Sequence, residues 1–439
     1  MAETKYRYRL PPCPAYDIPA MESWLEDLAA KGLHLSNDGF FGPLVTFEEG
    51  PPRREKFRLE PTTTNKGLFS EEYEPDPDTL ELHRQMGWTY RARRDQFHIY
   101  SSDDPNAPEL NTDPQVQAIT MAALTKFLWK SLRSTLILML FYAFLYSGNL
   151  VITGTILIGS WRAALLVVLL LWDLGRQLRA ITVLTRYRKQ LQNGEPLPHR
   201  SDYRRTNRRY LVSGAVRKAL WAFLLISFLA FLLPMLADEH YVPLEDQDLP
   251  FATLEDFCPG AEVRRMNGIL ESKVYGWSDF LAPQSYDMTE YAEVTFEGKT
   301  FDCYLTVQYF QTRWEWTARM AAKELVNQSG GNRFEQLLDR LFGNEPVQVT
   351  ELALPGADYC AWYNRHLPSP YVIVQKDSVV VLVRYSPYAD APRLSPEELA
   401  RIILSRISKK FVISSCILQM TVIYSSHRIQ VSTPRRHAP

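Results

Sequence analysis

The residue types that most often carry chemistry are scattered along this 439-residue chain and form no known catalytic spacing. Eight histidines and five cysteines are present, but the chain contains no HExxH, GxSxG, GxGxxG, CxxC or phosphate-binding loop pattern. Those spacings bring metal ligands, nucleophiles or phosphate-binding amides together on one element. We therefore predict no catalytic residue, no metal site and no cofactor, and the sequence favours a protein that is not an enzyme.

The charged residues have a strongly uneven distribution. Residues 1–113 hold 13 basic and 21 acidic residues, residues 114–218 hold 16 and 3, and residues 219–439 hold 20 and 26. The overall charge of −1 therefore results from acidic regions that cancel one strongly basic region. A dense basic block indicates an anionic partner, and the headgroups of a lipid bilayer are the simplest one. The predicted membrane-surface contacts are Arg176, Arg179, Arg186, Arg188, Lys189, Arg204, Arg205, Arg208 and Arg209.

Two long apolar runs accompany the basic block. No charged residue occurs from Ser134 to Trp161 or from Ala219 to Ala237. Both runs are long enough for a helix to cross a hydrocarbon layer of about 30 Å. We predict a transmembrane helical hairpin over residues 132–182 and a third transmembrane helix over residues 218–237.

Charged residues within the predicted hairpin need a partner or water. We place Arg162 at the membrane surface, because an arginine at the bilayer centre costs about 2.5–3.5 kcal/mol. Asp173 follows the apolar run that begins at Ala163. The spacing predicts an intramembrane charge pair between Asp173 and Arg176, since residues three apart meet on one helix face.

The basic residues also predict orientation, because they collect on the cytoplasmic side of membranes. Residues 1–113 and the basic connector 183–217 should be cytoplasmic, and residues 238–410 should form an extracytoplasmic domain. The N-terminus MAETKYRYRL is polar, so the first apolar helix would have to direct insertion. Residues 411–439 form an apolar and then basic tail, which could be a strand, a disordered end or a membrane-associated segment.

The N-terminal region alternates short strand and helix patterns. Strand signals at Lys5–Leu10, Phe40–Glu48 and Arg53–Glu60 surround a helix from Asp17 to about Lys31, and a second helix at Pro77–Met86 precedes two more strands. The strands Phe40–Glu48 and Arg53–Glu60 are predicted to pair as a hairpin. This order predicts a ferredoxin-like split βαβ domain. Its core should include Trp24, Trp88, Phe97, Tyr6 and Tyr8.

Four segments of this region carry recognisable motifs: KYRYRL, MESWLEDLAAKGLHL, FEEG with FRLE, and LHRQMGWTYRARRDQFHIYSS. Together they resemble a bacterial membrane-protein family with the domain of unknown function 2812. The resemblance covers residues 4–102, and the longer polar segment Thr62–Pro75 departs from it. The family has no established activity, so no catalytic residue is implied. Its members are often linked with PadR-type transcriptional regulators. The resemblance therefore implies a cytoplasmic protein partner in a PadR-type regulatory setting.

The C-terminal region reads as a second α+β domain. Strand patterns alternate with helices at Arg313–Asn327 and Arg333–Phe342, and a hairpin turns at Lys376-Asp377. Ser395 is predicted to cap a final helix over Pro396–Ile407, with Glu398 completing a capping box. The predicted topology exposes four cysteines outside, which permit up to two disulfides in three connectivities, and the sequence does not choose among them.

The predicted fold class is therefore α+β, with a ferredoxin-like N-terminal domain, three transmembrane α-helices and an extracytoplasmic α+β domain. We interpret the chain as a multi-pass cell-membrane protein with a regulatory or sensory role that couples its outer domain to a cytoplasmic protein-interaction domain. Two alternatives stay open. One is a membrane enzyme with an unrecognised extracytoplasmic site, and the other is anionic-lipid or nucleic-acid binding by the connector. We expect no specific nucleic acid, and the oligomeric state is undetermined.

Overall fold

The computed structural model describes residues 5–408 apart from 42–43, 63–74, 111–112, 147–150, 237–240, 245–248, 267–270, 297, 329–340, 343–346, 365–368 and 388–392. The chain divides into two compact units. Unit 1 consists of Met1–Met139 and Leu166–Ile226, and unit 2 consists of Leu140–Leu165 and Ser227–Pro439. Both units mix helices with antiparallel strands, so the predicted α+β class is confirmed.

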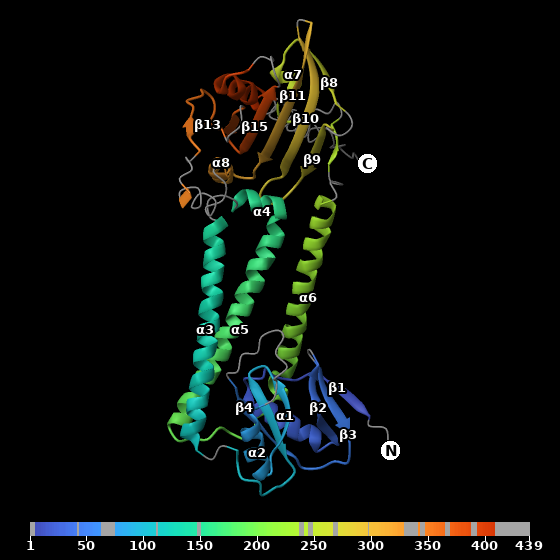
Figure 1. The fold of residues 1–439 in the computed structure, drawn as a ribbon, viewed down its shortest axis with the longest axis vertical. Helices are drawn as coiled ribbons and strands as arrows, with labels where there is room; N and C mark the ends of the chain where they lie inside the picture. Colours follow the sequence, from blue (N-terminus) through green and yellow to red (C-terminus); the bar gives the residue numbers. More distant parts are fainter. Residues whose placement is uncertain are drawn as a thin grey trace, which may run out of the picture. The chain divides into compact units, whose positions relative to one another are not determined.

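In the N-terminal part of unit 1, the described residues form two helices and six strands. Figure 1 shows these elements in blue. They are β1 (Tyr6–Arg9), α1 (Ile18–Ala29), β2 (Leu33–Phe41), β3 (Leu44–Glu49), β4 (Lys56–Pro61), α2 (Pro77–Gln85), β5 (Thr89–Arg94) and β6 (Phe97–Ser102). The strands form two antiparallel sheets with the orders β1-β3-β2 and β4-β6-β5. The described strands therefore do not form the single sheet of the predicted ferredoxin-like split βαβ domain.

The predicted hairpin between Phe40–Glu48 and Arg53–Glu60 is also wrong. Strand β3 pairs with β2, and β4 pairs with β6. The Gly-Pro dipeptide at 42–43 separates β2 from β3 in the chain. Glycine and proline are the strongest strand breakers, so this dipeptide was a sequence signal against the single strand that we predicted over Phe40–Glu48.

Four helices follow the N-terminal strands. They are α3 (Pro114–Tyr146), α4 (Ile152–Ile158), α5 (Ser160–Gln192) and α6 (Arg204–Leu236). Among the described residues, only Asn207–Leu233 within α6 is by itself long and apolar enough to cross a membrane. Helices α4 and α5 pass the same test only as a pair, and they are bent by 101°. The prediction of three transmembrane helices is therefore supported for one helix.

The core of unit 1 is built around the apolar face of α1. Met21 and Leu25 are fully buried, and the rings of Trp24 and Phe47 meet edge to face with centroids 5.5 Å apart. Of the other aromatics predicted for the core, Trp88 and Phe97 are buried, whereas Tyr6 and Tyr8 are exposed. The same core includes Ala118, Met121 and Leu124 of α3 and Leu184 and Leu191 of α5. The first turns of α3 and the end of α5 therefore fold together with the globular domain.

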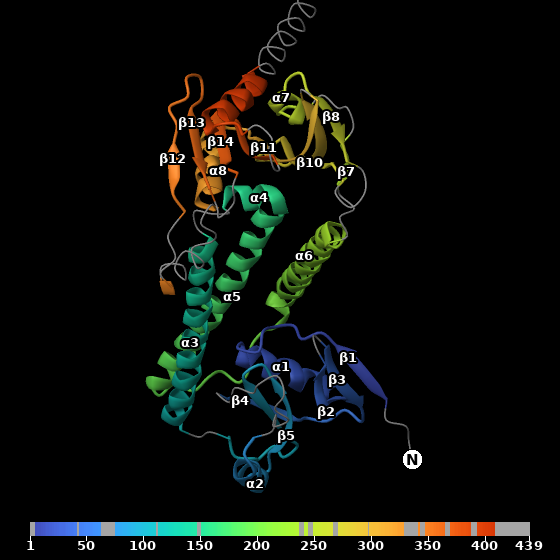
Figure 2. The ribbon, with the colours of Figure 1, turned by 45° about the horizontal axis from the view of Figure 1, so that its top comes forward.

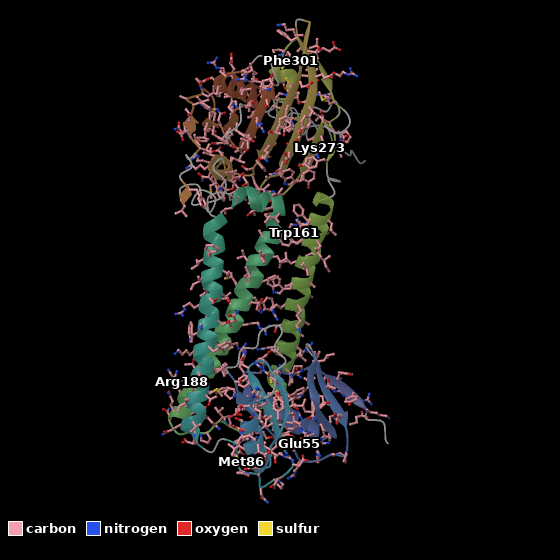
Figure 3. The ribbon with its side chains drawn as sticks, viewed as in Figure 1. Glu55, Met86, Trp161, Arg188, Lys273 and Phe301 are labelled. Atoms are coloured by element: carbon pink, nitrogen blue, oxygen red, sulfur yellow. The ribbon has the colours of Figure 1, made fainter. Side chains whose placement is uncertain are left out.

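The bend between α4 and α5 is made at Gly159, whose φ of +94° is unfavourable for other residues. The guanidinium of Arg162 closes this corner by donating to the carbonyl of Ile158 at 2.8 Å and to Ser227 Oγ of α6 at 2.7 Å. It also lies over the rings of Trp161 and Phe231, at 4.7 and 5.3 Å from their centroids. Figure 3 labels Trp161. We predicted that Arg162 lies beside water, but protein groups partly bury it.

The remainder of unit 2 is built around a large sheet with helices on both faces (Figure 2). Its elements are β7 (Val242–Pro243), α7 (Leu254–Phe257), β8 (Glu262–Arg265), β9 (Lys273–Trp277), β10 (Gln284–Phe296), β11 (Lys299–Gln311), α8 (Glu315–Asn327), β12 (Val349–Glu351), β13 (Tyr359–Tyr363), β14 (Tyr371–Lys376), β15 (Val379–Pro387) and a helix over residues 396–408. The strand order is β12-β13-β14-β15-β11-β10-β9-β7, and β8 also pairs with β10.

Alternating side chains give this sheet two apolar faces. Val381 and Val383 of β15 pack in the core with the 396–408 helix, whereas Val380 packs on the opposite face with α8. Helix α4 joins that second face, because the buried carboxylate of Glu324 accepts from the backbone N–H groups of Ile152 and Thr153 at 2.8–2.9 Å. The short helix that follows α3 in the chain is thus part of unit 2.

Most local predictions for this region are confirmed. The hairpin β14–β15 turns at Asp377 with a φ of +51°, and Ser395 and Glu398 form the predicted capping box. The strand pattern that the sequence shows near Tyr291–Phe296 covers only the second part of β10, which begins at Gln284. Most of the predicted helix at 333–342 lies outside the described residues, as do residues 411–439.

Candidate functional site

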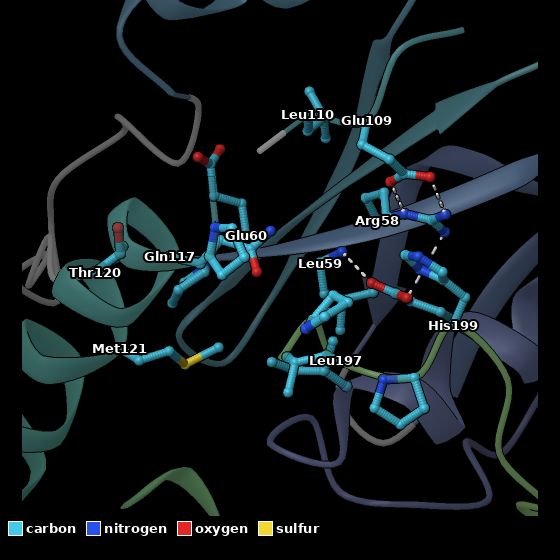
Figure 4. Close-up of a pocket in the computed structure, with 16 residues that line it drawn as sticks. Arg58, Leu59, Glu60, Glu109, Leu110, Gln117, Thr120, Met121, Leu197 and His199 are labelled. Carbon is cyan, nitrogen blue, oxygen red and sulfur yellow. Dashed lines mark hydrogen bonds and ion pairs between the residues drawn. The ribbon is translucent and has the colours of Figure 1, made fainter. Parts of the chain in front are cut away.

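Unit 1 contains a cavity of about 260 Å³ where three separate parts of the chain meet (Figure 4). Helix α1 and strand β4 contribute one wall. The segment around Glu109 and the first two turns of α3 contribute another, and residues 196–198 with His199, from the connector between α5 and α6, complete it. Figure 4 shows Arg58, Glu109 and His199 on one side of the cavity and Gln117 and Met121 on the other. The cavity therefore lies where the globular domain joins the long helices.

Arg58 of β4 organises the charged side of the cavity. Its Nε and Nη2 donate to the two carboxylate oxygens of Glu109 at 2.6 and 2.7 Å, which is the bidentate geometry that suits a guanidinium. Its Nη1 lies 3.7 Å from Glu22 Oε2 and 3.5 Å from Glu26 Oε1. One guanidinium thus faces three carboxylates.

Glu22 is the most unusual of these carboxylates, since it is only 4% exposed. Its Oε1 accepts from the backbone N–H of Leu59 at 2.9 Å, while Oε2 accepts no hydrogen bond from the residues that the structure describes. Burial raises the pKa of Glu22 to about 8, and the charge of Arg58 opposes that rise. Burial likewise raises the pKa of Glu26, whereas the hydrogen bond from Arg58 lowers the pKa of Glu109.

Perturbed carboxylates beside a cavity are typical of binding and catalytic sites. Glu22 could hold or release a proton near neutral pH, and the three-carboxylate cluster could bind a positive group. Across the described residues, no three His, Cys, Asp or Glu side chains are grouped to hold a metal ion.

Sequence reasoning missed this cluster. The available signal was Glu22 itself, which follows Ile18 by four positions and precedes Leu25 by three, so it lies on the apolar face of α1. A carboxylate in that position needs a buried partner. Neither Arg58 nor Glu109 could be identified as that partner, because the sequence does not show which strand lies beside α1.

The structure gives Asp173 a different partner from the one that we predicted. Its carboxylate accepts from Arg217 Nη1 at 2.8 Å and from Trp221 Nε1 at 3.1 Å, both on α6. Arg176 lies on the same helix as Asp173 and makes no ion pair with it. These contacts join α5 to α6.

Part of the basic connector contacts the N-terminal domain. Asp27 of α1 lies 3.3 Å from Arg200 and 3.4 Å from Arg204, and it accepts from the hydroxyl of Tyr203 at 2.9 Å. Of the predicted membrane contacts, Arg204 thus has a protein partner. Within the described residues, no ion pair involves Arg176, Arg179, Arg186, Arg188, Lys189, Arg208 or Arg209, and the side chain of Arg205 lies outside the described part.

The described cysteines are unpaired in the structure, and two of them share a partner. Cys258 and Cys303 lie 3.5 and 3.7 Å from the hydroxyl of Tyr385, while Cys13 and Cys360 are buried elsewhere. Hydrogen bonds from Cys303 and Tyr385 lower the pKa of Cys258, and burial raises the pKa of Cys360 to about 11. Cys416 lies outside the described residues.

Comparison with known proteins identifies one part of the chain. No curated protein matches the sequence, and no solved structure matches the fold. A family model described as "Protein of unknown function (DUF2812)" matches residues 17–132. That span begins at Asp17, immediately before α1, and ends within α3, so it includes the α3 residues that complete the core of unit 1. The chain therefore contains a DUF2812 domain, which forms much of unit 1 and most of the cavity wall.

Proposed function

We propose that this chain is a multi-pass integral membrane protein with a regulatory or sensory role. Its DUF2812 domain would lie in the cytoplasm, where a protein partner in a PadR-type regulatory setting could contact it, and the sheet domain of unit 2 would lie outside. Signals would pass between the two through α3, α5 and α6.

The exposed apolar surface of the long helices carries the membrane part of the proposal. On α6 the exposed side chains include Phe223, Leu225, Ile226, Leu229, Leu232 and Leu233. Ala219–Leu236 of α6 holds no charged residue, and 18 helical residues span about 27 Å, close to the thickness of a hydrocarbon core. Exposed apolar side chains at Ile137 and Leu140 of α3 and at Val167 and Leu171 of α5 extend this surface. Water-facing helices seldom carry so much apolar surface.

The position of the cavity supports the sensory part. Each of the three long helices has residues in both compact units, and the cavity wall includes the beginning of α3 and the connector between α5 and α6. A molecule that fills the cavity would therefore contact the globular domain and two helix ends together. Such contacts could favour one helix arrangement over another.

Glycosylation mapping tests the membrane placement. Gly298→Asn creates the acceptor Asn-Lys-Thr in the exposed turn between β10 and β11, where φ is +77° and asparagine is tolerated. Pro77→Asn creates Asn-Asp-Thr at the exposed start of α2. Both are made with Asn327→Gln, which removes the natural Asn-Gln-Ser sequence. During translation with microsomes, we expect glycosylation of the Gly298→Asn chain alone.

The reverse pattern would mean that the orientation is inverted. Glycosylation of both chains would contradict the placement of the two domains on opposite sides, and release of the protein by alkaline carbonate would contradict a membrane-spanning topology.

A pair of glutamines on α3 tests the coupling. Gln117 lines the cavity, whereas Gln115 lies on the same helix and is exposed. We expect Gln117→Trp to change hydrogen exchange in the unit 2 residues of α3, α5 or α6, and Gln115→Trp to leave it unchanged. Equal exchange in both variants would contradict coupling through the cavity.

A further inference from the structure

The cavity wall carries more negative than positive charge. Glu22, Glu60 and Glu109 line it, and Glu26 adds a fourth carboxylate at Arg58. Arg58 is the cation that these groups share, and its two strongest hydrogen bonds are already given to Glu109. Glu60 has no ion-pair partner among the described residues, and His199 is the remaining titratable group on the wall. An anionic ligand would face repulsion here, whereas a cation would offset the excess charge.

The oxygen Oε2 of Glu22 is the atom to which a ligand cation would bind. Oε1 is held by Leu59, so the carboxylate is fixed in orientation, and Oε2 has no donor closer than Arg58 at 3.7 Å. Oε2 is thus an acceptor without a hydrogen bond from the described residues, and a ligand ammonium group would donate one to it.

Most of the remaining wall is apolar, with Gln117 and Thr120 as its polar members. Ile18, Leu59, Leu110, Met121 and Leu197 line the cavity opposite or beside the carboxylates. Its volume of about 260 Å³ is near the lower end for pockets that bind small molecules. A ligand therefore needs a compact apolar body joined to one positive group.

We propose that the cavity binds a small organic cation, a protonated primary amine on an aryl or alkyl body, with its ammonium group at Glu22 Oε2. This proposal rests on the sensory part of the proposed function, because it names the chemistry that the cavity would sense. It does not depend on the membrane placement or orientation.

Calorimetric titration of the full chain in mild detergent tests the proposal. Phenethylamine serves as the probe, 2-phenylethanol as a neutral molecule of the same shape and phenylacetate as an anion. We expect saturable binding of phenethylamine and none of the other two. Because Glu22 must ionise to attract the cation, binding should tighten by at least about tenfold between pH of about 6 and about 9.

Matched variants assign the binding to this cavity. Glu22→Gln keeps the acceptor for the N–H of Leu59 and should remove both the affinity and its pH dependence. Glu81→Gln changes an exposed carboxylate on α2 and should alter neither. Gln117→Trp should block binding, and Gln115→Trp should not. Circular dichroism spectra identical to wild type establish that each variant is folded.

Several results would overturn the proposal. One is that phenethylamine does not bind, and another is that 2-phenylethanol binds equally well. A third is that Glu22→Gln binds phenethylamine with the affinity and the pH dependence of the wild type. If phenethylamine binds as expected while filling the cavity leaves hydrogen exchange unchanged, the ligand assignment stands and the sensory coupling fails. Failed glycosylation mapping bears only on the membrane placement.

Discussion

Glu22 shows how one residue can oppose the stability of the fold that holds it. A leucine at this position would continue the apolar face of α1, whereas the carboxylate has to be removed from water. The N–H of Leu59 and the charge of Arg58 offset part of that cost, but the pKa of Glu22 still rises to about 8. At neutral pH much of the folded population therefore carries a proton on Glu22.

This proton makes stability depend on pH. Because the folded chain binds it more tightly than the unfolded chain, the free energy of unfolding should fall as pH rises from about 5 to about 8 and then level off. Glu22→Gln mimics the protonated group, so above pH 8 it should exceed wild type in stability by about 1–3 kcal/mol. Urea unfolding in mild detergent, followed by tryptophan fluorescence, measures both. Wild-type and Glu22→Gln curves with the same pH dependence would contradict the shift, and Glu81→Gln should follow wild type.

Cys258 should be the most reactive of the described cysteines. Hydrogen bonds from Cys303 and Tyr385 stabilise its thiolate, whereas burial raises the pKa of Cys13 to about 12 and that of Cys360 to about 11. We expect a short iodoacetamide pulse near neutral pH to modify Cys258 at least about tenfold faster than Cys13 or Cys360. Peptide mass spectrometry gives the rates. Tyr385→Phe removes one hydrogen bond and should slow modification of Cys258, and equal rates at all three thiols would refute this assignment.

At the scale of elements, the corner between α4 and α5 determines where α4 packs. The bend at Gly159 directs α4 onto the sheet domain, where Glu324 binds its first N–H groups. The prediction of a simple transmembrane hairpin did not anticipate this helix. The apolar pattern of residues 152–158 suits burial against α8 as well as burial in lipid, and hydropathy does not distinguish them.

Gly159→Ala should destabilise the chain by about 1–2 kcal/mol, because alanine is strained at φ +94° and its β-carbon would lie 2.9 Å from Arg162 Nη1. Gly175→Ala is the matched control, since Gly175 lies inside α5 with nothing within 4 Å of its added β-carbon. That change should be neutral or stabilise by up to about 1 kcal/mol. Thermal unfolding in detergent compares them. A drop in melting temperature of the same size for both would show that the corner does not need glycine.

For the whole molecule, the apolar length of α6 is the feature on which membrane placement depends. Leu229 lies near the middle of the uncharged run and is 48% exposed, whereas Val212 lies in the basic part of the same helix and is 55% exposed. An arginine near the bilayer centre costs about 2.5–3.5 kcal/mol, and one at the cytoplasmic surface costs little.

We therefore expect Leu229→Arg to lower the fraction of chains that stay in the membrane pellet after an alkaline carbonate wash, or to lower the glycosylation of the Gly298→Asn reporter. Val212→Arg should behave like the parent chain in both assays. Equal retention and glycosylation of the two variants would mean that α6 does not cross a bilayer at this segment.

The sequence by itself determined the local features of this protein. The periodicity of α1, the Asp377 turn, the capping box at Ser395 and the charge-free run of α6 were readable because each depends on residues close together in the chain. The DUF2812 resemblance came from motifs of the same kind.

The tertiary structure decided which of these elements meet. It formed two sheets where we predicted one, and it paired Asp173 with Arg217 instead of Arg176. It also brought Glu22, Arg58 and Glu109 together around a cavity. Each of these outcomes depends on residues that are distant in the chain. Partner choice follows from the pairing and packing that bury the most apolar surface while satisfying buried polar groups. A single sequence records the residues that need partners, and only the folded chain shows which ones they find.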